Sequence, residues 1–189
     1  MYALIACGVF RPEIEHLAGT LGFPTEVHYL DPGLHVSFDA LESKLRDALE
    51  ACRAKRTIVA FGACHPRMEE MLAEYGAALL DCQNCVDAFI TREEVERRAA
   101  RGLYFYLSPG WIEVWPDIFR QLGWGQDEAR LEMGCFKGAV FIDTLGNAAK
   151  YEDDLLNFLD FTLLTYEVVP GNLEHFSSLI RQAARSLGG

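Results

Sequence analysis

An α/β fold is predicted by three features of this sequence. Short apolar runs, rich in β-branched and aromatic residues, alternate along the chain with helix-like segments. The loops between them are short, and no repeat, linker or low-complexity segment interrupts the alternation. The length of 189 residues suits one domain with a sizeable core. We therefore expect residues 1–189 to form a single α/β domain, with a mostly parallel, doubly wound (Rossmann-like) sheet and helices on both faces.

The first half of the chain contains strand-like runs whose helical connections carry recognisable start signals. Pro12 suits the first turn of a helix, and Pro66 can open another. Between these two helices, Ser37 or Asp39 can cap a third, longer helix, which has an apolar stripe at helical spacing. The strands are expected at residues 2–7, 25–30, 57–62 and 77–81, and the helices at 12–21, 37–55 and 66–76.

The second half continues the alternation. Thr91 and Glu94 have the spacing of a capping box, which starts a helix. Ser108-Pro109-Gly110 ends an aromatic strand and precedes an aromatic-rich helical region, most simply interpreted as core. The strands are expected at residues 103–107, 138–143 and 165–169, and the helices at 91–101, 111–124, 149–163 and 172–186.

Composition and charge exclude several classes of protein. The net charge of −11 argues against binding to nucleic acid and against docking on an anionic membrane. No apolar stretch approaches the roughly 18 residues of a membrane span. The start MYALIACGVF lacks the positive region of a signal peptide, so we interpret it as a first strand. We therefore expect a cytoplasmic protein whose six cysteines form no disulfide framework. Grouped cysteines in a reducing compartment more often bind metal or do chemistry.

Cysteines follow three of the predicted strands. Cys7 ends the first strand, Cys64 follows the third, and Cys82 and Cys85 follow the fourth in the segment DCQNC. His35 comes after the second strand in the same way. Ligands of open α/β sheets bind outside the carboxyl ends of the strands, so these side chains are expected at one edge. The sequence thus predicts a metal site of Cys7, Cys64 and Cys82, with His35 or Cys85 as the fourth ligand.

The ligand types favour zinc but leave alternatives. Thiolate and imidazole suit tetrahedral zinc, whereas four thiolates are also the usual ligands of an iron–sulfur cluster. The spacing C-x-x-C of Cys82 and Cys85 fits a thiol–disulfide oxidoreductase equally well. A further alternative is a carrier that holds a metal without turnover. Asp81 could orient a ligand or carry a proton, and His65 could support a ligand from behind. Cys52 and Cys135 are interpreted as small buried hydrophobes.

Motifs of other chemistries are missing from the sequence. It contains neither the G-x-S-x-G of a nucleophile elbow nor the G-K-[ST] of a phosphate loop. The dinucleotide-binding G-x-G-x-x-G is likewise absent.

The same residues resemble an uncharacterised bacterial and archaeal family of domains of unknown function, the sixteen-thirty-eight family. The resemblance covers nearly the whole chain. It departs at His65-Pro66-Arg67, where the family pattern has Gly after the cysteine, and at Gln83-Asn84-Cys85, where apolar residues are expected. Cys85 is thus either a ligand peculiar to this chain or a bystander. The likeness is carried by Cys7 with Glu13, Leu34-His35, Gly62 with Cys64, Asp81-Cys82, Ser108-Pro109-Gly110-Trp111, Asp143-Thr144 and Tyr166-Glu167 with Gly171.

The resemblance implies a role around methyl transfer. Members of the family are often encoded near corrinoid-dependent methyltransferases for methylamines. On that basis the expected setting is corrinoid or methyl-transfer metabolism. A corrinoid is then a further candidate cofactor, or the molecule that a carrier holds without turnover. The partners that the resemblance implies are a corrinoid protein or a methyltransferase, and self-association into a homo-oligomer is a further option.

Overall fold

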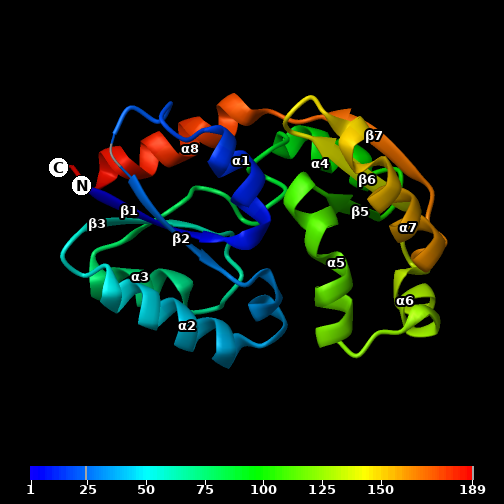
Figure 1. Cartoon of the computed structure of the whole chain (residues 1–189), viewed down its shortest axis with the longest axis horizontal. Helices are drawn as coiled ribbons and strands as arrows, with labels where there is room; N and C mark the ends of the chain where they lie inside the picture. Colours follow the sequence, from blue (N-terminus) through cyan, green and yellow to red (C-terminus); the bar gives the residue numbers. More distant parts are fainter. Residues whose placement is uncertain (24, 189) are drawn as a thin grey trace. The chain divides into compact units, whose positions relative to one another are not determined.

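The computed structural model describes residues 1–23 and 25–188 and confirms the α/β class. Parallel strands form two sheets that are flanked by helices (Figure 1). Every strand pair in the described part of the chain is parallel. Each strand lies within two residues of the range that the sequence predicts, because short apolar runs between turns identify strands well.

The elements follow one another in strand–helix order. No helix among the described residues is both long and apolar enough to cross a membrane. The strands are β1 (Tyr2–Cys7), β2 (Thr25–Leu30), β3 (Arg56–Ala60), β4 (Ala78–Leu79), β5 (Tyr104–Leu107), β6 (Gly138–Asp143) and β7 (Tyr166–Pro170). The helices are α1 (Arg11–His16), α2 (Phe38–Ala51), α3 (Met68–Tyr75), α4 (Arg92–Ala99), α5 (Pro109–Gln121), α6 (Gln126–Met133), α7 (Glu152–Thr162) and α8 (Leu173–Ser186).

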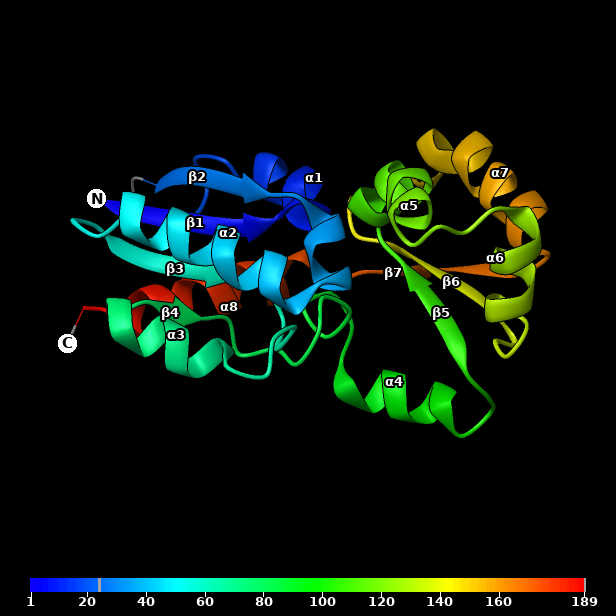
Figure 2. The same ribbon diagram turned by 90° about the horizontal axis from the view of Figure 1, so that it is seen from below.

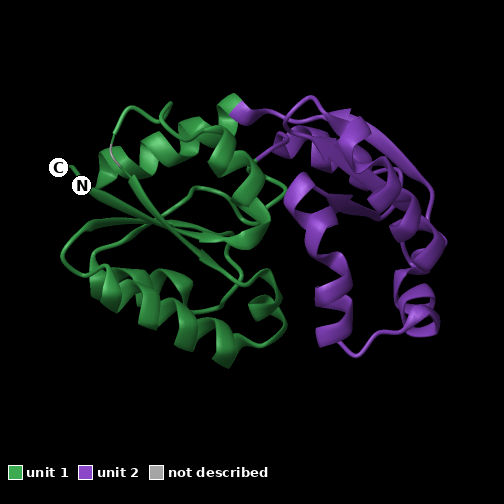
Figure 3. Cartoon of the chain, viewed as in Figure 1, with its two compact units in different colours: residues 1–88, 174–189 green, residues 89–173 purple. Residues whose placement is uncertain are grey.

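The strands are divided between two sheets, whereas the sequence led us to expect one. Residues 1–88 and 174–189 form one compact unit, and residues 89–173 form a second (Figure 3). The strand order is β2-β1-β3-β4 in unit 1 and β5-β6-β7 in unit 2. Alternation along the chain identifies strands but not their neighbours, and the two-residue β4 ends the first sheet at an edge. That the whole chain is a single domain stays a prediction.

Unit 1 covers both faces of its sheet with helices (Figure 1). Leu41, Leu45 and Leu49 recur at helical spacing on α2 and pack with α3 against one face of β1 and β3. The helix α2 begins at the expected cap, where the Ser37 hydroxyl accepts a hydrogen bond from the amide of Ala40 (3.3 Å). The other face carries α1 and α8.

The last helix brings the end of the chain back to unit 1. The hydroxyl of Tyr2 donates a hydrogen bond to the carbonyl of Ala184 (3.3 Å). The rings of Phe10 and Phe176 stack with their centroids 5.0 Å apart. These contacts join residues that are distant in sequence, so α8 belongs to the same core as β1.

Unit 2 places three helices on one face of its sheet and one on the other. The helices α5, α6 and α7 bury Trp115, Phe119 and Phe158 against β5 and β6. The sequence did not separate α6 from the aromatic region before it, where Gly123 (φ 74°) ends the helical run. The helix α4 lies on the opposite face (Figure 2) and has no buried residue. It is therefore held by its ends and by charges rather than by a hydrophobic face.

Replacing Leu45 by Ala should lower the free energy of unfolding by about 2–5 kcal/mol, because the side chain is fully buried between α2 and the sheet. The matched control is Lys44→Ala, one residue away and exposed, which should change it by less than about 0.5 kcal/mol. Urea unfolding followed by circular dichroism measures both. Equal small effects would show that α2 does not pack as described.

Candidate functional site

Four of the six cysteines gather at the carboxyl edge of the sheet of unit 1. Cys7 ends β1, Cys64 follows β3, and Cys82 and Cys85 lie in the loop after β4. All four are partly buried. Their ionised forms would repel one another: Cys64 and Cys85 raise the pKa of Cys7 and of Cys82, and Cys64 raises that of Cys85. The structure therefore brings together the thiols that the parallel strand ends were expected to deliver.

Glycines allow the loops that carry these thiols to approach closely. A Cβ atom at Gly62 would lie 2.5 Å from the Cα of Asn84, a distance that side chains do not tolerate. The amide of Ala63 donates a hydrogen bond to the carbonyl of Gln83 across the same contact (2.9 Å). Likewise, a Cβ at Gly8 would lie 2.8 Å from the Cδ of Pro32. Glycine is thus required where the loops after β1 and β3 meet their neighbours.

The loop after β4 is fixed by its own side chains. The Oδ1 atom of Asn84 accepts hydrogen bonds from the amides of Val86 (2.8 Å) and Asp87 (3.1 Å). The Oδ2 atom of Asp87 accepts one from the amide of Gln83 (3.3 Å). Such side-chain to backbone bonds replace those of a regular element. The segment DCQNC therefore holds a defined turn between Cys82 and Cys85.

The surroundings of the thiols disfavour their ionised forms. Burial is the main cause that raises the pKa of Cys7, Cys82 and Cys85 to about 12 each, and it also raises that of Cys64. Amide groups oppose this at two positions, where Val9 hydrogen-bonds Cys7 and Gly62 hydrogen-bonds Cys64. Burial prevails, so the thiols are neutral at pH 7.

Carboxylates surround the same cluster. Asp81 and Asp87 add to the raised pKa of Cys82, Asp87 and Glu13 add to that of Cys85, and Asp31 adds to that of Cys7. Glu13 is fully buried in the first turn of α1. In the sequence, Glu13 stands out only as part of the family likeness, and its position just after β1 was the available signal. Acidic neighbours disfavour thiolates but favour a bound cation.

The predicted histidines have hydrogen-bond and ion-pair partners other than the cysteines. His35 is exposed on the short helix η2 (Pro32–Val36), where its Nδ1 forms a hydrogen bond with the carbonyl of Pro32. His65 is buried; its Nδ1 accepts a hydrogen bond from the amide of Arg67 (3.1 Å), and its Nε2 lies 3.6 Å from a carboxylate oxygen of Glu42. These bonds anchor the start of α3, so His65 supports the fold beside Cys64.

The remaining predicted positions differ in burial. Asp81 is exposed and adjoins Cys82. Cys52 is fully buried in the core under α2, as expected, whereas Cys135 is exposed in unit 2, so the interpretation of Cys135 as a buried hydrophobe was wrong. Residues 1–23 and 25–188 contain no group of three or more His, Cys, Asp or Glu side chains already arranged to hold a metal ion.

Residues 29–180 match the model of a family described as a protein of unknown function, DUF1638. No curated protein and no solved structure matches the chain. The family match covers most of the chain, including Cys64, Cys82 and Cys85, and the chain therefore belongs to this family.

In metal-free protein, Cys7, Cys82 and Cys85 should react with iodoacetamide roughly 1000-fold more slowly than a free thiol at about pH 8. Only the thiolate reacts, and their pKa of about 12 lowers its fraction by three powers of ten. Because the raised pKa delays ionisation, each rate should rise about tenfold per pH unit above pH 8. Mass spectrometry of digested samples measures each site.

The exposed Cys135 is the internal control in that experiment, and it should be modified first. In denaturant all six cysteines should react at similar rates. Modification of Cys82 or Cys85 in folded protein as fast as that of Cys135 would contradict the described environment.

Proposed function

We propose that this member of the DUF1638 family binds one metal ion, zinc, through cysteine thiolates at the carboxyl edge of the sheet of unit 1. One observation carries the proposal. Cys7, Cys64, Cys82 and Cys85 come from three separate loops, and their charges act on one another within a carboxylate-lined region. A packed core gains nothing from gathering four thiols beside acids, whereas a soft cation is stabilised by that arrangement.

The donor set suits the ion. Thiolates select soft or borderline metals, and four of them complete a tetrahedral zinc site. Binding must displace the protons that burial holds on these thiols, so the affinity for the metal rises with pH. When bound, the ion would hold the sulfurs as thiolates at neutral pH and supply Lewis acidity. The chain contributes the loops, the acidic surroundings and the partial exclusion of water.

Cys85 is the better-supported fourth ligand. It interacts electrostatically with Cys7, Cys64 and Cys82, and the turn through Asn84 holds it beside them. His35 is exposed, and its Nδ1 is engaged by Pro32. The family pattern instead has apolar residues after Asp-Cys, where this chain has Gln83-Asn84-Cys85. Cys85 is then a ligand particular to this chain.

Two roles are compatible with such a centre. Three thiolates and an exchangeable position would suit an enzyme of methyl or thiol transfer, with Asp81 beside Cys82 as a proton carrier. Four thiolates would close the site and suit a structural centre or a carrier of metal or corrinoid. The gathering of four thiols supports the second role. The methyl-transfer setting, with a corrinoid protein or methyltransferase as partner, rests on the family resemblance alone.

An iron–sulfur cluster and a thiol–disulfide exchanger are the competing proposals. Both use thiols, but an exchanger needs only Cys82 and Cys85. The additional presence of Cys7 and Cys64 at the same edge supports a metal or a cluster.

Protein purified without oxygen should be colourless and contain about one zinc ion per chain by elemental analysis. Cys7→Ser, Cys64→Ser and Cys82→Ser should each lose most of that zinc, because each removes one of the few ligands. Cys52→Ser and Cys135→Ser are the matched controls and should keep it, since Cys52 lies in the core and Cys135 in the other unit.

The other outcomes identify the competitors. Brown protein that contains iron and sulfide would show that the centre is an iron–sulfur cluster and not a zinc ion. Metal-free, folded protein in which only Cys82 and Cys85 matter for activity with a disulfide probe would establish the exchanger instead.

A further inference from the structure

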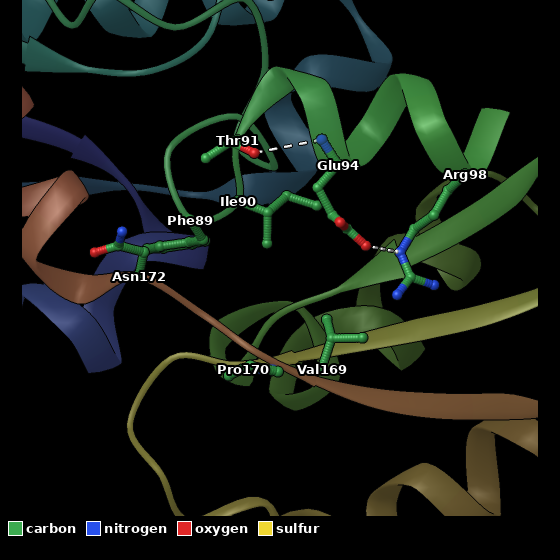
Figure 4. A pocket seen from close by; sticks show the side chains of 8 residues that line it. All are labelled: Phe89, Ile90, Thr91, Glu94, Arg98, Val169, Pro170 and Asn172. Atoms are coloured by element: carbon green, nitrogen blue, oxygen red, sulfur yellow. Dashed lines mark hydrogen bonds and ion pairs between the residues drawn. The ribbon is translucent and has the colours of Figure 1, made fainter. Parts of the chain in front are cut away.

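Unit 2 contains a cavity of about 300 Å³ between α4 and the end of β7. All of its walls belong to unit 2, and it shares no residue with the cysteine cluster. It lies beside the carboxyl end of a parallel strand, the edge where α/β sheets bind ligands. The volume is at the lower end of the range for small-molecule sites. The lining residues are Phe89, Ile90, Thr91, Glu94, Arg98, Val169, Pro170 and Asn172 (Figure 4).

The walls are fixed by hydrogen bonds. The amide of Asn172 donates to the carbonyl of Phe89 (2.7 Å), which joins the two segments that close one end of the cavity. The hydroxyl of Thr91 caps α4 by accepting from the amide of Glu94 (3.3 Å). Because α4 buries none of its residues, it leaves the space above Val169 unfilled. The cavity therefore lies between a helix without buried residues and the end of β7.

One wall carries opposite charges. Figure 4 shows Glu94 and Arg98 projecting from one side of α4, above the apolar Val169 and Pro170. The Nε of Arg98 donates to Oε1 of Glu94 (2.8 Å), and its Nη1 pairs with Glu167. The side chains of Glu94 and Arg98 are only 23% and 15% exposed. In the described part of the chain, Nη2 of Arg98 donates no hydrogen bond and remains available.

The combination of an ion pair and apolar walls determines which charges a ligand should carry. A purely apolar molecule would displace water from the Glu94–Arg98 ion pair and offer no hydrogen bonds in its place, so its binding would cost free energy. A cation would compete with Arg97 and Arg98 for Glu94, and an anion would compete with Glu94 and Glu167 for Arg98. A molecule with both charges can insert into the Glu94–Arg98 ion pair, because its ammonium group replaces Arg98 at Glu94 and its carboxylate replaces Glu94 at Arg98. Its apolar part can then contact Ile90, Val169 and Pro170.

We propose that this cavity binds a small zwitterion with an aliphatic side chain, of the class of the branched-chain α-amino acids. Its ammonium group lies against Glu94, its carboxylate accepts from Arg98, and its alkyl group fills the space beside Val169. The proposal does not depend on the metal site, because the two sites share no residue.

Four probes with related branched carbon skeletons separate charge from shape: leucine, isocaproate, isoamylamine and isoamyl alcohol. Each is titrated into isotope-labelled full-length protein, and amide NMR shifts are followed. Leucine should shift the amides of Ile90, Thr91 and Val169 and bind at least about tenfold more tightly than the other three. Glu94→Gln should weaken leucine binding by about tenfold or more, because the ammonium loses its partner.

Two further variants guard against a loss of structure. Glu96→Gln removes a carboxylate from the same helix that pairs with Arg92 outside the cavity, and it should leave binding unchanged. Val169→Phe fills the cavity and should abolish leucine binding while the amide spectrum stays folded. Shifts away from the cavity, binding of isocaproate or isoamylamine as tight as that of leucine, or no response to any probe would each overturn the proposal.

Discussion

The parallel pairing of β1, β3 and β4 is the constraint on which the candidate site depends. Parallel strands end at the same edge, so residues that follow them are brought together although they are far apart in sequence. Gly8 and Gly62 then let the following loops press against their neighbours. Without those contacts, Cys7, Cys64 and the segment DCQNC would still follow strands at the same edge of the sheet, but their loops would lie further apart.

The electrostatics follow from that placement. Four thiols are moved out of water into a region that already contains Glu13, Asp31, Asp81 and Asp87. Both burial and acidic neighbours favour the neutral thiol at pH 7. A metal ion, in contrast, binds the thiolate, so these surroundings oppose the form that a metal would need. The metal ion that we propose would overcome this opposition, because it would replace the protons and be attracted by the same carboxylates.

Sequence patterns predicted the strands because short apolar runs between turns are a local signal. The same signal puts Cys7, Cys64 and Cys82 at or just after strand ends, whereas a metal site built from them stays a prediction. Such patterns could not predict the division into two sheets, since alternation says nothing about which strands pair. His35 has the right position after β2, yet η2 directs its ring to Pro32. The cavity beneath α4 could not be predicted either, because its walls come from residues 89–98 and 169–172, which are far apart in sequence and carry no motif.

The central claim concerns sulfur ligands from several loops, and X-ray absorption at the zinc edge tests it most directly. The account predicts a coordination shell of four sulfur atoms at about 2.3 Å in protein isolated without added metal. Replacing Cys85 by His should change one scatterer from sulfur to nitrogen at about 2.0–2.1 Å. A shell made mainly of nitrogen and oxygen, or a spectrum unchanged in Cys85→His, would contradict a centre built from these four cysteines.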